Sequence, residues 1–213
     1  MEVQFYNPAH FRVDDHETLA RAVDALVFGA LVTSGPDGLA VTHAPFLLNR
    51  GAGALGTLEA HVARANPHWR ALDGVDALVI FQGPQHYVSP SWYATKQQTH
   101  RVVPTWNYVI VHARGVARTF EDPARLRARV AALTDRMEAR RAEPWSVDDA
   151  PAEYIEQLSR GIVGIDVELT ALEGKFKLGQ NRVESDRASL GAALLVERPD
   201  LHAALQSLYP RRE

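Results

Sequence analysis

The sequence contains no cysteine among its 213 residues. Disulfides, thiolate metal sites and cysteine nucleophiles are therefore excluded, and a reducing compartment fits this composition. The residues Met1 to Phe5 show no basic segment followed by an apolar run, and no apolar run in the chain approaches the roughly 20 residues that span a bilayer. We therefore expect a cytoplasmic protein with no membrane partner.

Several sequence signatures of chemistry are also missing. There is no Gly-x-Ser-x-Gly, no phosphate-binding Gly-rich loop ending in Lys-Ser/Thr, and no Gly-x-Gly-x-x-Gly after a strand, which disfavours hydrolase, nucleotide-triphosphatase and Rossmann functions. The central histidines form no His-x-His or His-Glu-x-x-His pair, so we expect no metal site. They are His43, His61, His86, His100 and His112. A net charge of −3 argues against a protein built mainly to grip nucleic acid.

What is present is an ordinary globular composition, with 46% apolar and 23% charged residues. We expect a single domain over residues 1–213 with a helical C-terminal tail at about 185–209. The hydrophobic pattern predicts a helix over residues 15–27 and strands over 28–33, 39–49 and 55–62. Turns at Ser34–Gly38 and Gly51–Gly53 join these strands into an antiparallel meander, which favours a barrel over a parallel sheet.

The second half predicts a mixture of strands and helices. Strands are expected over 77–81, over 109–120 with a bend or bulge at Gly115, and over 162–169. Residues 82–101 are predicted to form a long loop. Asp122-Pro123 opens the clearest helix, with Leu126 on its apolar face. Its arginines are expected on a solvated face rather than a nucleic-acid surface: Arg125, Arg129, Arg136 and Arg140. A shorter helix is predicted to end near Gly161.

The stretch from Leu58 to Trp69 suits a phosphate. Its first half alternates like a strand, and Asn66 followed by Pro67 is typical of a capped helix start. Arg64 projects from the connection between them, beside free backbone N–H groups and the positive end of a helix dipole. An ordinary strand–turn–helix corner with a solvated Arg64 is the alternative.

Two other stretches supply groups that a planar, phosphorylated cofactor needs. The first is the segment from Lys175 to Arg182, which has several hydrogen-bond donors within eight residues and no acidic residue among them. The alternative interpretation of this segment is a basic loop exposed to solvent. The segments around Trp92 and Trp106 combine aromatic rings with amides, although a core or interface role suits those tryptophans as well. A cofactor bound with micromolar affinity requires a binding free energy of about 8 kcal/mol, which is more than a single arginine contributes.

Seven ordered motifs resemble the PaiB-type family of FMN-binding proteins. They are Phe28-Gly-Ala-Leu-Val-Thr33, His43-Ala-Pro-Phe-Leu-Leu48, His61-Val-Ala-Arg-Ala-Asn-Pro67, Val79-Ile-Phe-Gln-Gly-Pro84, Ser89-Pro-Ser-Trp-Tyr93, Val103-Pro-Thr-Trp-Asn-Tyr108, and Gly174-Lys-Phe-Lys-Leu178 with Gln180-Asn-Arg182. The resemblance covers most of residues 1–190. It implies an α+β fold, an antiparallel split β-barrel with peripheral helices, that binds FMN as a homodimer with flavin at the interface. It also implies a negative transcriptional regulator.

The resemblance implies a set of cofactor-binding residues by position. Thr42 and His43 would lie along the ring, and the phosphate would be held by the residues around the strand–helix connection: His61, Val62, Ala63, Arg64 and Asn66. Thr105 and Asn107 would reach across from the partner subunit. Lys177, Gln180 and Asn181 would complete the pocket. Gly179 stands where family members usually carry serine, so that position is left out of the set.

Two other functions stay open at this point. An FMN-dependent oxidoreductase of the flavin reductase kind needs no acid, base or nucleophile of its own, because the flavin carries the redox chemistry. A ligand carrier without turnover is the other alternative, in which one of the histidines would ligate a haem iron. Direct DNA binding is weakly supported, since the two helices within 123–160 are too far apart in sequence for a helix-turn-helix unit and the tail helices lack a basic face.

Overall fold

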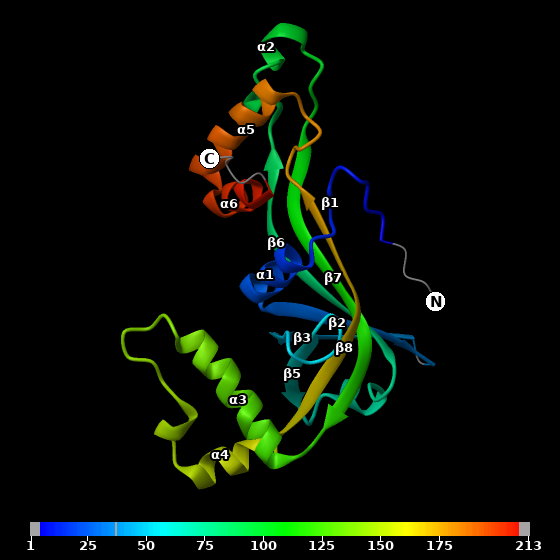
Figure 1. Ribbon diagram of the computed structural model, residues 1–213, viewed down its shortest axis with the longest axis vertical. Helices are drawn as coiled ribbons and strands as arrows, with labels where there is room; N and C mark the ends of the chain where they lie inside the picture. Colours follow the sequence, from blue (N-terminus) through cyan, green and yellow to red (C-terminus); the bar gives the residue numbers. More distant parts are fainter. Residues whose placement is uncertain (1–4, 37, 209–213) are drawn as a thin grey trace. The chain divides into compact units, whose positions relative to one another are not determined.

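The computed structural model describes residues 5–36 and 38–208, and it divides into two compact units. Unit 1 comprises Met1–Asp15, Gln82–Val111 and Glu173–Glu213, and unit 2 comprises His16–Phe81 and His112–Leu172. The strand order of the sheet is β3-β2-β6-β7-β8-β5-β4, and β1 pairs with β8. Strands β6, β7 and β8 contribute residues to both units. The antiparallel sheet with helices confirms the predicted α+β class (Figure 1).

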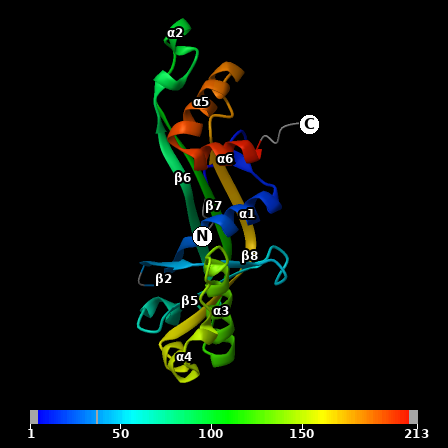
Figure 2. The ribbon, with the colours of Figure 1, turned by 90° about the vertical axis from the view of Figure 1, so that its left-hand side faces the viewer.

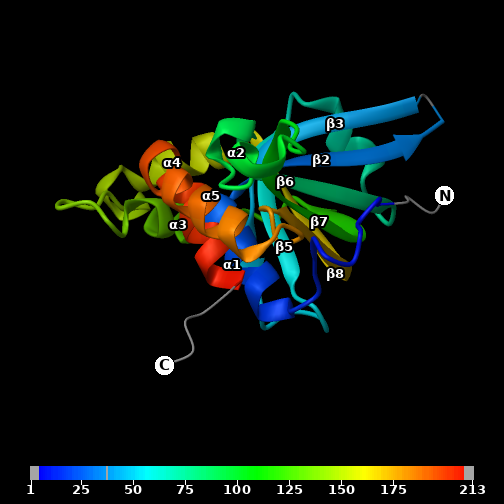
Figure 3. The ribbon, with the colours of Figure 1, turned by 90° about the horizontal axis from the view of Figure 1, so that it is seen from above.

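Unit 2 contains a hairpin that the turn signal correctly predicts. β2 (Phe28–Gly35) and β3 (Gly38–Pro45) pair along their full length, and Figure 3 shows them side by side. Asp37, inside the predicted turn, lies outside the described residues. The strand predicted over 39–49 is divided at Phe46, whose backbone N–H donates to the Val27 carbonyl, so β4 (Leu47–Asn49) is a separate strand.

The second hairpin of the predicted meander also forms, although its last strand has a further partner far away in the sequence. β5 (Thr57–Ala63) pairs with β4 on one side and with β8 (Ile162–Lys177) on the other, where Leu58 faces Val167 and His61 faces Gly164. β2 pairs with the start of β6 (Asp76–Val88). The core of unit 2 is apolar and includes Leu31, Phe46, Leu58, Phe81 and Ile165.

All the helices of unit 2 except the short η3 lie close to their predicted positions. The unit contains α1 (His16–Leu26), η1 (Pro67–Ala71), α3 (Pro123–Glu138), η3 (Val147–Asp149) and α4 (Ala152–Ser159). Asp122 caps α3 by accepting from the Arg125 N–H, and Figure 2 shows α3 next to α4.

The expectation of a solvated Arg129 is wrong. That side chain is 5% exposed and pairs with Glu59 and Asp166, because a carboxylate on each of two neighbouring strands compensates its burial.

Unit 1 corrects the predicted loop over 82–101. Residues 82–88 continue β6, and the rest contains η2 (Pro90–Trp92) and the short helix α2 (Lys96–Thr99). β1 (Arg12–Val13) pairs with the end of β8, which extends to Lys177 instead of ending at 169. The tail forms α5 (Glu184–Glu197) and α6 (Pro199–Leu208), which pack together (Figure 1). Tyr209, at the predicted end of the tail, lies outside the described residues.

The glycine at 115 has a different role from the predicted bend. β7 (Thr105–Phe120) runs through it as one strand. A Cβ at Gly115 would lie 2.1 Å from the backbone oxygen of Glu168, so this position requires glycine because the two backbones approach closely. Within the described residues, the helices are all too short or too polar to cross a bilayer.

Candidate functional site

The connection after β5, residues 63–66, has the local structure that the sequence predicts, with a shorter helix. β5 alternates, with Ala60 and Val62 buried and His61 half-buried. Asn66 caps η1 by accepting from the His68 N–H at 3.0 Å, and Pro67 occupies the first helical position. The helix is a five-residue 3-10 turn, so its dipole contributes less than a full α-helix would. We call residues 63–66 the β5 corner.

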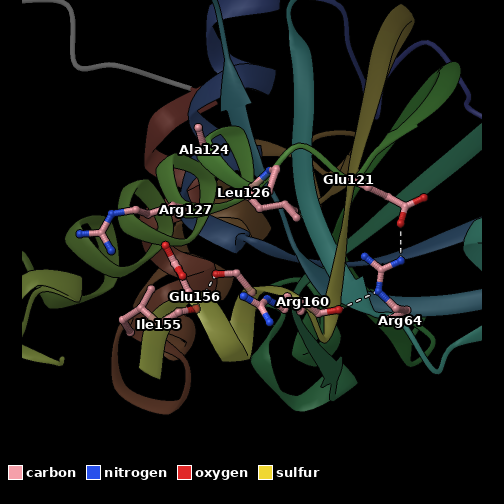
Figure 4. A pocket seen from close by; sticks show the side chains of 10 residues that line it. Arg64, Glu121, Ala124, Leu126, Arg127, Ile155, Glu156 and Arg160 are labelled. Carbon is pink, nitrogen blue, oxygen red and sulfur yellow. Dashed lines mark hydrogen bonds and ion pairs between the residues drawn. The ribbon is translucent and has the colours of Figure 1, made fainter. Parts of the chain in front are cut away.

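Arg64 is held by protein groups in this corner, although its side chain is partly exposed to solvent. Its Nε donates to the Arg160 carbonyl at 2.7 Å, and one terminal nitrogen donates to the Ile162 carbonyl at 3.2 Å. The other terminal nitrogen pairs with the Glu121 carboxylate, as Figure 4 shows. The Arg64 and Glu121 side chains are 38% and 52% exposed. The guanidinium is therefore fixed in direction by two carbonyls, while its carboxylate partner stays accessible to solvent.

Thr42 lies in a buried hydrogen-bond network that the sequence did not reveal. Its Oγ1 is 2.8 Å from His68 Nδ1 and accepts from the Asn66 side-chain amide at 3.0 Å. His68 Nε2 is 2.8 Å from Thr33 Oγ1 on the neighbouring strand. Burial lowers the pKa of His68. The network ties two predicted cofactor residues, Thr42 and Asn66, to one imidazole.

Sequence reasoning missed His68 and Thr33, although one signal was available. His68 stands two residues after the capping Asn66, in a motif already chosen for Arg64. What the sequence does not show is that β2 and β3 place Thr33 and Thr42 on the same buried face of the hairpin.

The other predicted residues of unit 2 point in different directions. His43 is exposed and stacks on Phe28, with ring centroids 6.2 Å apart. Val62 is buried and Ala63 is exposed. The Nδ1 atom of His61 is buried and has no hydrogen-bond partner among the described residues. Burial lowers the pKa of His61, and the nearby Arg129 lowers it further, so the ring is a neutral group with an unused nitrogen.

Unit 1 brings Thr105 and Lys177 together. Lys177 Nζ donates to Thr105 Oγ1 at 2.6 Å. Burial lowers the pKa of Lys177, and the positive charges of Lys175 and Arg182 lower it further. Lys175 is buried in β8 and donates to the Tyr6 carbonyl at 2.8 Å, so the alternative of a solvated basic loop is wrong for this lysine. Three cationic side chains in a small space favour an anionic ligand.

Gln180 and Asn181 lie just after β8. Gln180 accepts from the Leu178 N–H at 2.8 Å and donates to the Phe176 carbonyl, which holds the turn, whereas Asn181 is exposed. Gly179 has a φ of +88°, and a Cβ there would lie 2.7 Å from Leu190 Cδ2. The glycine that replaces the family serine therefore suits a left-handed backbone and a close contact with α5.

Asn107 has an unusual environment. Its side chain is 1% exposed, and neither Nδ2 nor Oδ1 has a hydrogen-bond partner within the described chain. A buried amide without partners costs about 1–3 kcal/mol, so proteins rarely retain one without a reason. The free donor and acceptor of Asn107 are groups that the edge of a polar heteroaromatic ring can satisfy. In this respect the predicted residues fit a flavin.

A cavity of about 590 Å³ lies beside Arg64 in unit 2 (Figure 4). Arg64 and Glu121 line it together with residues of α3 and α4: Pro123, Ala124, Leu126, Arg127, Ile155, Glu156, Ser159 and Arg160. We call it the α3–α4 cavity. No group of three or more histidine, aspartate or glutamate side chains in residues 5–36 and 38–208 has the arrangement of a metal site.

Comparisons with known proteins agree with the predicted family. The family model described as "Putative FMN-binding domain" matches residues 5–171. The chain is also 33% identical over 182 residues to the protease synthase and sporulation protein PAI 2 of Bacillus subtilis, a match that covers 85% of this chain and 84% of that protein. The family prediction is confirmed.

Solved structures with a similar fold include a flavocytochrome and an FAD- and heme-binding protein. The flavocytochrome Anf3 from Azotobacter vinelandii has a TM-score of 0.59 at 18% identity, over 88% of this chain and 78% of that one. The FAD and heme binding protein from Mycobacterium smegmatis has a TM-score of 0.58 at 17% identity, over 84% of this chain and 80% of that one. These similarities support the split-barrel fold and no more.

Proposed function

This chain belongs to the FMN-binding domain family, and we propose that it binds FMN with the phosphate at the β5 corner and acts as a regulatory flavoprotein. The observation that carries the proposal is the family match over residues 5–171. Bound FMN supplies redox chemistry, and the protein's contribution is to hold and orient it.

Arg64 is the residue that we propose for the phosphate. Its pair with Glu121 is exposed, and exposed ion pairs contribute only about 0–1 kcal/mol. A charge-assisted hydrogen bond to phosphate contributes about 1.5–3 kcal/mol. We propose that the phosphate replaces Glu121 as the partner of this terminal nitrogen. The carbonyls of Arg160 and Ile162 keep the guanidinium in place during this exchange.

The remaining predicted residues would surround the ring and the ribityl chain. We propose that Thr42 and His43 lie along the ring and that His61, Val62, Ala63 and Asn66 surround the phosphate with Arg64. Thr105 and Asn107 would come from the partner subunit of a homodimer, and Lys177, Gln180 and Asn181 would complete the pocket. The unpaired amide of Asn107 supports this assignment, because its donor and acceptor match those of the flavin pyrimidine ring.

The regulatory role rests on the Bacillus subtilis relative, named a protease synthase and sporulation protein. An FMN-dependent oxidoreductase is the rival, and the net charge of −3 favours it over a direct grip on DNA. Salt-sensitive retention of a specific DNA sequence would support the regulator. Bleaching of bound flavin by NAD(P)H, followed by reoxidation with a small acceptor, would support the enzyme.

Absorbance tests FMN binding itself. Purified protein is mixed with FMN, desalted and scanned through the visible range. We expect the flavin bands to remain with the protein at close to one FMN per chain. A flavin-free spectrum after desalting, together with no fluorescence quenching in a direct titration, would contradict the proposal.

A further inference from the structure

The α3–α4 cavity lies next to the proposed FMN site and is largely built from other residues. Of the twelve predicted FMN residues, Arg64 alone lines it. Its volume of about 590 Å³ falls within the range of about 300–1,000 Å³ that small-molecule sites occupy. The cavity is therefore a candidate site for a second small molecule.

Two opposite charges on the cavity wall remain unpaired after the others are matched. Arg64 pairs with Glu121, and Arg127 pairs with Asp148. Within the described residues, the side chains of Glu156 and Arg160 make no hydrogen bond or ion pair. Glu156 lies in α4 and Arg160 directly follows its last residue. Because the two positions are four residues apart, they lie on the same side of the helix and are separated by about 6 Å along its axis. One carboxylate and one guanidinium thus face the same space (Figure 4).

The interior of the cavity is apolar. Leu126, Ile155, Pro123 and Ala124 contribute carbon surface to its wall. The Ser159 hydroxyl donates to the Ile155 carbonyl at 2.7 Å, so its proton is already used. An occupant must therefore bury an apolar body here while it keeps its polar groups at Glu156 and Arg160.

We propose that the α3–α4 cavity binds a free amino acid with a large apolar side chain. The α-carboxylate pairs with Arg160, the α-ammonium group pairs with Glu156, and the side chain packs on Leu126 and Ile155. An apolar acid without the ammonium group leaves Glu156 unpaired, and an apolar amine leaves Arg160 unpaired. The zwitterion alone matches both charges. This proposal does not rest on FMN binding.

Calorimetric titration with three matched ligands tests the proposal. L-Phenylalanine carries both charges, 3-phenylpropionate lacks the ammonium group, and phenethylamine lacks the carboxylate. We expect the full-length protein to bind L-phenylalanine at least about tenfold more tightly than either analogue, since each lost charge-assisted contact is worth about that much. Arg160→Gln and Glu156→Gln should each weaken L-phenylalanine binding by about tenfold or more.

Arg140→Gln is the control, because Arg140 is an exposed arginine after α3 that does not line the cavity. It should leave L-phenylalanine binding unchanged. Equal affinity for the three ligands, loss of binding in the control, or no binding of L-phenylalanine or L-tryptophan at about 10 mM would overturn the proposal. So would displacement of L-phenylalanine by FMN with equal weakening of both ligands in Arg160→Gln. A protein that binds L-phenylalanine but not FMN would contradict the proposed function and leave this inference standing.

Discussion

Asn107 shows how one residue can be poorly placed for folding and well placed for a ligand. Its amide is buried without a hydrogen-bond partner among the described residues. We predict that Asn107→Leu raises the free energy of unfolding of the ligand-free protein by about 1 kcal/mol, because an unpaired buried amide is removed. The same variant should weaken FMN binding by about tenfold, since the donor and acceptor are lost.

Chemical denaturation and FMN fluorescence quenching measure the two effects on the same preparation. Leu178→Ala, at a buried position in the same unit, is the comparison, and it should lower stability through the lost packing. If Asn107→Leu destabilises the ligand-free protein, or leaves FMN affinity unchanged, the interpretation of Asn107 is wrong.

Two glycines, one before α5 and one within it, should respond in opposite ways to the same change. Gly179 has a φ of +88°, and its Cβ would lie 2.7 Å from Leu190 Cδ2, so Gly179→Ala should lower the free energy of unfolding by about 1–2 kcal/mol. Gly191 lies inside α5, and a methyl group added there would meet open space, so Gly191→Ala should raise it by about 0.5–1 kcal/mol. Urea unfolding of both variants checks the prediction, and effects of the same sign would refute it.

At the scale of elements, the longer helices were predictable, whereas the short helices η2, α2 and η3 and the strand lengths were not. α1, α3 and α4 carry strong local signals, namely apolar residues at helical spacing and, for α3, a capping Asp122. Gly83 and Pro84 indicated a loop over residues 82–88, although these residues continue β6. β8 likewise extends to Lys177, where its apolar alternation has been replaced by lysines. Strand length depends on pairing partners that lie far away in the sequence, which a local pattern does not contain.

The same limit applies to the candidate site. The motif around Arg64 was visible, but its partners Arg160 and Ile162 lie almost a hundred residues later. Arg129 looked solvated because its carboxylate partners, Glu59 and Asp166, lie on two other strands. Arg64 and the segment Lys175–Arg182 were visible in the sequence itself, whereas the other candidate cofactor residues were identified through the family resemblance. All their roles toward FMN stay predictions.

Histidines on three elements predict how stability depends on pH. Burial lowers the pKa of His61 in β5, His68 in η1 and His112 in β7, the last to about 4. Above pH 6.5 these rings are neutral in both the folded and the unfolded chain, so they contribute nothing to the pH dependence of the free energy of unfolding. Below pH 6.5 the unfolded chain takes up the protons first, so the free energy of unfolding falls down to about pH 4. His112 contributes the largest share of this loss, because its pKa shift is the largest of the three.

Denaturant titrations between pH 4 and pH 7 measure this loss. His112→Gln should flatten the profile, whereas His10→Gln, at an exposed position, should leave its slope unchanged. A wild-type free energy of unfolding that stays constant from pH 7 to pH 4.5 would disagree with the buried, neutral histidines.

For the whole molecule, the homodimer and the cytoplasmic location stay predictions, as does the single domain over residues 1–213.

β3 is a terminal strand of the sheet and exposes Leu39 and Val41, whose side chains are 73% and 54% exposed. Such an apolar edge strand favours a second chain as its cover. We predict a dimer by light scattering at micromolar concentration and a shift toward monomer in the double variant Leu39→Lys, Val41→Lys. Val196→Lys, on α5 and 80% exposed, is the control. A wild-type monomer would contradict this prediction.

The most direct test of the central claim compares FMN with riboflavin, which lacks the phosphate, in Arg64→Ala. We predict that this variant weakens FMN binding by about 1.5–3 kcal/mol and leaves riboflavin binding unchanged, because Arg64 contacts the phosphate. Arg50→Ala, which removes an exposed arginine paired with Glu17 and Asp24, should affect neither flavin. Unchanged FMN affinity in Arg64→Ala, or equal weakening of both flavins, would contradict a phosphate site at the β5 corner.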